Sequence, residues 1–108
     1  MAWALVGVAG ILEIVFALCM KASDGFTRPT PALLTVAAGL SSVILLSLAL
    51  RTLPVGTGYA VWTGIGAAGT AILGMLLLGD IASPARIFCL TLIFAGVIGL
   101  KLVTPGGA

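Results

Sequence analysis

The sequence has 108 residues, of which 61% are hydrophobic and only 7% are charged. A soluble domain carries about 25% charged residues, so this composition excludes a soluble globular protein and indicates a membrane protein. The formal net charge of +2, with no histidine and two cysteines, gives no basic patch for nucleic acid and no metal-site signature.

Four apolar runs are long enough, at roughly 18 to 23 residues each, to cross a hydrocarbon core of ~30 Å. They lack strand alternation, which favours helices over barrel strands. The short connectors leave no room for an extramembrane domain, and no phosphate loop or nucleophile motif predicts an enzyme or a cofactor. We therefore expect an all-α membrane protein, with residues 1–108 forming one four-helix domain and the spans at 3–20, 32–50, 57–79 and 85–103.

The first run carries an acid at its centre, in the segment ILEIVFALCM. A rise of 1.5 Å per residue places Glu13 about 15 Å deep, at the middle of the membrane. Its side chain is too deep to reach the interface, and a charge at this depth costs about 2.5 to 3.5 kcal/mol on insertion scales. Ala9, Gly10 and Ala17 lie on the same stripe of the helix and leave space beside the carboxylate.

Two hypotheses account for Glu13. In the first, the residue is a protonated acid that holds helices together by hydrogen bonds. In the second, it alternately binds a proton and a cation. A Ser, Thr or Asn holds helices at lower cost, which favours the second hypothesis. An ionised acid in an apolar core must be neutralised by one partner or the other, and this competition is the coupling that an antiporter needs.

The second run contains a mid-membrane hydroxyl, Ser42, next to Ser41. A serine inside a helix usually bonds to a carbonyl of its own preceding turn. On spacing alone, Ser42 is therefore a weak candidate for a binding role.

The third run, within GTGYAVWTGIGAAGTAILG, places Tyr59, Trp62 and Gly66 on one face at spacings of three and four. An indole face can stack on a cation, and a phenol can orient a carboxylate or a ligand. The alternative is an interfacial aromatic belt, because both aromatic residues lie in the first turns of the run. Gly64 and Gly66 weaken the helix and mark an expected flexible point.

The fourth run ends with Lys101, whose long side chain can reach the interface. The same run offers Ala95, Gly96 and Gly99 as small residues that permit close helix approach. A chain of this size has little interior in which to hold a ligand, so dimerisation is the natural way to build a cavity.

Basic residues are almost evenly divided between the two sides of the membrane. Four spans put Lys21, Arg28 and Arg86 on one side and Arg51 and Lys101 on the other. Because this asymmetry sets the direction of insertion, the near balance is compatible with insertion in both orientations. A single orientation fixed by Lys21 and Arg28 is the alternative.

Taken together, these features resemble the small multidrug resistance family. The segment AGILEIVFALCMKASDGFTRPTP is similar to the family's first helix and loop, LPVGTGYAVWTGIGAAGTAI to its third helix and GVIGLKL to its last. Within the family, WTGIGA and the lysine of IGLKL are similar to the guanidinium exporter subtype.

The resemblance implies an antiparallel, dual-topology homodimer in the bacterial cytoplasmic membrane that exchanges protons for guanidinium or close analogues. Its partners are then membrane lipid, the cation, protons and a second copy. By this resemblance Glu13 is the shared proton and substrate site, Ser42, Tyr59 and Trp62 line it, and Lys101 belongs to a supporting polar network.

One residue departs from that subtype, which usually carries tryptophan one turn after the acid, where this chain has Phe16. A phenyl ring keeps a face for cation contact but loses the indole N–H that could hold the carboxylate. Two alternatives stay open: a broader exporter of quaternary ammonium or other hydrophobic cations, and one subunit of a heteromeric pair.

Overall fold

The computed structural model describes residues 1–104, which form four α-helices and no strand. All four helices are long and apolar enough to cross a membrane. This confirms the predicted all-α fold with four membrane-spanning helices. Their bounds are α1 (Ala2–Ala22), α2 (Pro29–Ala49), α3 (Val55–Leu77) and α4 (Pro84–Val103).

Local sequence explains where several of these helices begin and end. Proline stands in the first turn of both α2 and α4, where its missing N–H has no intrahelical partner to lose. The Ser83 hydroxyl caps α4 by accepting the Arg86 N–H at 3.2 Å. Helix α3 ends at Leu77 rather than at the end of the expected run, because Gly79 turns the chain with φ +73°.

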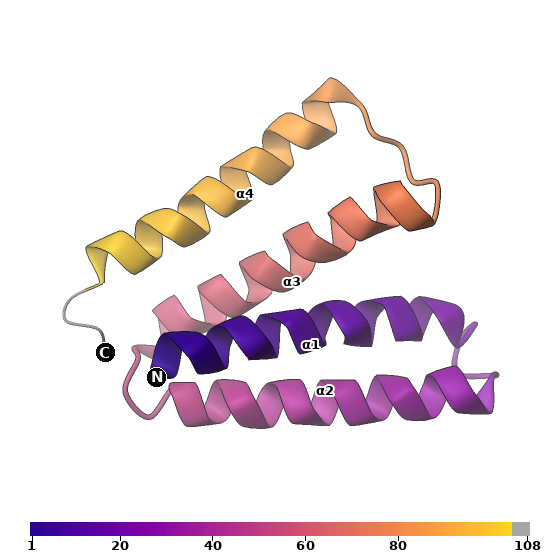
Figure 1. The fold of residues 1–108 in the computed structure, drawn as a ribbon, viewed down its shortest axis with the longest axis horizontal. Helices are drawn as coiled ribbons and strands as arrows, with labels where there is room; N and C mark the ends of the chain where they lie inside the picture. Colours follow the sequence, from indigo (N-terminus) through magenta and orange to yellow (C-terminus); the bar gives the residue numbers. More distant parts are fainter. Residues whose placement is uncertain (105–108) are drawn as a thin grey trace.

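The connector between α1 and α2 is a tight reversal centred on Ser23. Its buried hydroxyl donates to the Met20 carbonyl at 2.7 Å and accepts the Phe26 N–H at 3.1 Å. Asp24, Gly25 and Phe26 all have positive φ, which lets so short a segment reverse direction. Helices α1 and α2 consequently run side by side over their whole length (Figure 1).

The helices form a thin layer. Helix α1 packs against both α2 and α3, whereas α4 packs chiefly against α3 and splays away from the other two (Figure 1). The principal extents are 44 × 34 × 16 Å, and a helix with its side chains is already about 10–12 Å across. One chain is therefore too thin to surround a ligand on all sides.

The buried core lies where α1, α2 and α3 meet, and α4 contributes no buried residue to it. Because small residues there bring the helix backbones close together, α1 and α3 pack tightly. The core members are mostly aliphatic: Ala2, Val6, Ala9, Leu46, Ala49, Leu53, Val61 and Trp62.

Candidate functional site

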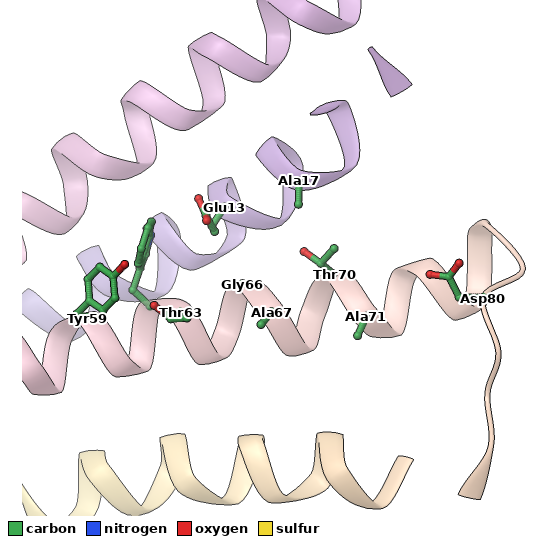
Figure 2. A pocket seen from close by; sticks show the side chains of 10 residues that line it. Glu13, Ala17, Tyr59, Thr63, Gly66, Ala67, Thr70, Ala71 and Asp80 are labelled. Atoms are coloured by element: carbon green, nitrogen blue, oxygen red, sulfur yellow. The ribbon is translucent and has the colours of Figure 1, made fainter. Parts of the chain in front are cut away.

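The Glu13 side chain projects from α1 onto α3 and lies against Gly66. Only glycine fits at that position of α3. A Cβ atom built on Gly66 would lie 2.6 Å from the Glu13 Cγ and 3.1 Å from its Cβ. Any larger residue would push the acid aside, so Gly66 makes room for the carboxylate. Figure 2 shows Glu13 above this part of α3. The predicted role of Gly64 and Gly66 as a flexible point stays a prediction, since α3 is one continuous helix here.

The Glu13 side chain lies where two open cavities meet. The first, of about 430 Å³, runs along α3 between α1 and the end of the helix. The second, of about 320 Å³, opens towards α2 and is lined by Glu13, Phe16, Val36, Gly39, Leu40, Val43 and Trp62. Residues lining the first are Glu13, Ala17, Tyr59, Trp62, Thr63, Gly66, Ala67, Thr70, Ala71 and Asp80.

A buried chain of hydrogen bonds holds Trp62, which lines both cavities. The Trp62 indole N–H donates to the Ser42 hydroxyl at 2.8 Å, and that hydroxyl donates to the Ala9 carbonyl at 2.7 Å. The chain thus joins α3, α2 and α1. Ser42 bonds across to another helix instead of to its own preceding turn, which the spacing alone did not indicate.

The two aromatic residues of α3 differ in their surroundings. Trp62 is only 9% exposed and belongs to the core, so the interfacial-belt interpretation is wrong for this residue. Tyr59 is 55% exposed, and its ring centroid lies 5.2 Å from that of Trp62 at an interplanar angle of 50°. Both line the larger cavity together with Glu13, but within residues 1–104 the Tyr59 hydroxyl makes no hydrogen bond to the acid.

Phe16 lies one turn after the acid and faces α2. Its Cδ1 is 2.7 Å from where a Cβ on Gly39 would stand, so the ring rests directly against the α2 backbone. The structure therefore brings Phe16 and Glu13 together on the wall of the α2-side cavity.

Lys101 lies away from the other predicted site residues. Its Nζ atom stands 5.8 Å from the ring centroid of Trp3, and the two residues line a different cavity of about 300 Å³. Within one described chain, Lys101 does not line either cavity at Glu13. Its membership of a polar network around the acid stays a prediction.

Sequence reasoning missed three polar residues of the larger cavity, namely Thr63, Thr70 and Asp80. Asp80 falls between the third and fourth expected spans, where the sequence alone gives an acid no particular role. The available signal was spacing: Thr70 follows Gly66 by four residues, so the two share a helix face.

Comparison with known proteins identifies the family. A family model described as Small Multidrug Resistance protein matches residues 1–93. Guanidinium exporters from Citrobacter freundii and Salmonella typhimurium are each 60% identical over 104 residues, covering 96% of this chain and 99% of the relative. One from Yersinia pseudotuberculosis is 57% identical, covering 96% of this chain and all of the relative. The resemblance in the sequence is thereby confirmed: the chain belongs to the small multidrug resistance family.

Proposed function

We propose that this chain is a proton-coupled antiporter that exports guanidinium and small guanidinyl cations, and that protons and substrate compete for Glu13. The observation that carries the proposal is the position of this carboxylate. It lies mid-span where two cavities meet, next to an aromatic pair. The names of the bacterial relatives, which are guanidinium exporters at 57–60% identity, supply the substrate class.

The chemistry of guanidinium suits such a site. The ion is planar, stays charged at any physiological pH and presents N–H groups in a fork that matches a carboxylate. It cannot leave the cell as a neutral molecule, so its path through the membrane needs a counter-charge. Glu13 supplies this charge, and one carboxylate binds a proton or the cation but not both. Cation binding on one side therefore expels a proton, which is the linkage that antiport requires.

The aromatic pair supports cation binding without competing for the carboxylate. The indole N–H of Trp62 is already bonded to Ser42, which fixes the ring plane. Cation–π attraction needs only the ring face, and the exposed Tyr59 ring widens the aromatic surface that a cation meets. Ser42 then acts by holding Trp62, rather than by touching the substrate.

A second copy completes the cavity in this proposal. One chain is a thin layer, and α4 presents an unburied face on which Gly96 and Gly99 have no atom within 4 Å of an added Cβ. Such small residues let a second α4 approach closely. The near balance of basic residues supports opposite orientations for the two copies in the bacterial cytoplasmic membrane.

Proton coupling is tested with purified protein in liposomes loaded with guanidinium chloride. Outward flow of guanidinium down its gradient should acidify the lumen as protons enter. Glu13→Gln, which cannot exchange a proton, should abolish this signal, whereas Asp24→Asn, in the α1–α2 connector, should retain it. Equal acidification by wild type and Glu13→Gln would end the antiport model. Absence of transport by the single purified chain would indicate an obligate second subunit.

Orientation is tested separately by labelling one cysteine in the α2–α3 connector, after replacing Cys19 and Cys89 by alanine. Dual topology predicts about half of the chains labelled from each side of intact vesicles. Labelling from one side only would exclude the antiparallel homodimer.

A broader exporter of hydrophobic cations is the second candidate, and the position of Phe16 favours it. The Phe16 ring lies in a cavity whose other members are mainly aliphatic α2 residues, so substituted cations can place an apolar group there. Phe16→Trp adds an indole N–H one turn from the acid, on the cavity wall that the two residues share. We expect it to favour guanidinium over tetraalkylammonium ions by at least about threefold, the scale of one weak hydrogen bond. Wild-type preference for tetraalkylammonium ions would move the assignment to the second candidate.

A further inference from the structure

The cavity at Glu13 continues along α3 to a second carboxylate. Asp80 lines the same space of about 430 Å³, and Figure 2 shows it beyond Thr70 and Ala71, at the far end from Tyr59. A cation that enters from this end of α3 meets Asp80 before it meets Glu13.

The backbone holds Asp80 against the end of α3. The left-handed turn at Gly79, with φ +73°, brings the Asp80 N–H to the Gly74 carbonyl at 3.1 Å. The Asp80 carboxylate then rests on Gly74, where the Cβ of any other residue would collide with it. A local contact therefore directs the acid back along the helix, although the residue as a whole is exposed.

This location is unfavourable for an acid in the absence of a cation. The C-terminal end of a helix carries partial negative charge from unpaired carbonyls, which repels a carboxylate and attracts a cation. Asp80 and the end of α3 thus act in the same direction, and together they make this mouth of the cavity electronegative.

Thr70 stands between the two acids. Gly66, Thr70 and Gly74 follow one another at four-residue spacing, so each step along the helix is about 6 Å and the two carboxylates are about 12 Å apart along α3. Figure 2 shows Thr70 projecting from α3 towards α1 at this intermediate level.

The Thr70 hydroxyl has no partner. Its oxygen is shielded from solvent and is, within residues 1–104, the one buried side-chain polar atom without a hydrogen bond. Thr35 and Thr91 show the usual alternative, since each donates to the carbonyl four residues earlier, at 2.7 and 2.9 Å. A buried hydroxyl without a partner is costly. Because Thr70 lines the cavity, rotation of its side chain about χ1 would turn the hydroxyl towards a polar ligand there and relieve that cost.

We propose that Asp80 and Thr70 form an outer cation subsite that captures a guanidinium-type cation before it reaches Glu13, an inference that rests on the proposed function. Asp80 attracts the ion by charge, and the Thr70 hydroxyl accepts one of its N–H groups in place of lost water. The acids are too far apart to bind one small cation together, so occupancy is sequential. Proton exchange stays at Glu13, and the outer subsite raises only the capture rate.

The test measures guanidinium transport in liposomes against substrate concentration, at low and high salt. Asp80→Asn should raise KM roughly threefold to tenfold at low salt, the lower end of electrostatic steering effects, and less at high salt. The maximal rate and the number of protons per guanidinium should not change. Asp24→Asn is the matched control, because it removes the same charge outside the cavity and asparagine tolerates the positive φ there.

Two further variants test the geometry. Thr70→Val keeps the shape of the side chain and should raise KM about twofold to fivefold at either salt concentration, as expected for one hydrogen bond. Thr91→Val, on α4, is its control. Gly74→Ala should displace the carboxylate and reproduce the effect of Asp80→Asn, and the double variant should add little to either.

Equilibrium binding separates failure of this inference from failure of the proposed function. In calorimetric titration with guanidinium chloride, Glu13→Gln protein should retain a weak site that the Glu13→Gln/Asp80→Asn protein loses. Wild-type transport with equal KM for Asp80→Asn and Asp24→Asn would overturn the outer subsite alone. Loss of proton coupling in Asp80→Asn would also overturn it, because Asp80 would then belong to the exchange site.

Discussion

Replacement of Ser42 by alanine probes the junction of α1, α2 and α3. The Ser42 side chain is fully buried, donates to the Ala9 carbonyl at 2.7 Å and accepts the Trp62 indole N–H at 2.8 Å. Alanine removes a single oxygen and fills nearly the same space. The effect of Ser42→Ala is therefore chemical rather than steric.

The magnitude depends on which group loses its partner. The Ala9 carbonyl still accepts the N–H four residues later in α1, but the Trp62 N–H is left buried and unpaired. An unsatisfied buried donor costs about 1–3 kcal/mol, whereas interhelical hydrogen bonds in membranes average about 0.6 and reach about 1.7 kcal/mol. We expect the free energy of unfolding to fall by about 1–2 kcal/mol, which is roughly a fivefold to thirtyfold change in the folding equilibrium.

Reversible unfolding in mixed micelles, followed by circular dichroism, measures this loss. Ser41→Ala is the matched control because Ser41 is the neighbouring hydroxyl and is exposed, so its loss should stay within about 0.5 kcal/mol. Ser42→Ala combined with Trp62→Phe should cost less than the sum of the single changes, since no orphaned N–H remains. Equal stability of the two serine variants, or strict additivity in the double variant, would refute the hydrogen-bond chain.

Two further changes test the packing around the site and at the far end of α4. Gly66→Ala should reduce transport at least about tenfold, because the new Cβ displaces Glu13. Transport should fall even though alanine favours the helix over glycine by about 1 kcal/mol. Gly56→Ala, where an added Cβ meets nothing within 4 Å, should leave transport unchanged, and equal effects would contradict the close-approach argument. Lys101→Met should lower stability by about 0.5–1 kcal/mol through loss of the cation–π contact with Trp3. Thermal unfolding measures this loss of stability. If Lys101→Met lowers stability by the same amount in a Trp3→Leu background, the cation–π contact contributes nothing.

The sequence predicts the number and type of the helices because the length and hydropathy of a run directly measure its ability to span a bilayer. It also predicts the depth of Glu13, since helical rise converts residue number into distance. The run that was expected to continue to Gly79 ends at Leu77, because a left-handed glycine ends the helix where hydropathy alone gives no signal.

Helix packing is harder to predict here, for a physical reason. These helices are apolar on all sides, so no amphipathic stripe marks which face is buried. The sequence consequently left both the belt and the binding interpretations open for Trp62, and it gave Ser42 little weight. Only the packed structure shows that these two residues bond to each other. Thr70 and Asp80 could not be predicted as site residues for the same reason, because only the packing of α1 against α3 brings them into one cavity with Glu13.

The contrast between Ser42 and Glu13 bears on the choice between a structural acid and an exchanging one. Holding the helices together is already achieved by the serine, whose hydroxyl both donates and accepts across helix boundaries. Within residues 1–104 the Glu13 carboxylate makes no hydrogen bond, and Gly66, which lies against the Glu13 side chain, has no side chain that could serve as a partner. An acid that served as glue would be bonded, and breaking that bond would oppose each exchange of partners. In the proposed exchange, an unbonded acid beside a cavity has no such bond to break, so a proton and a cation would replace one another with little rearrangement of the helices.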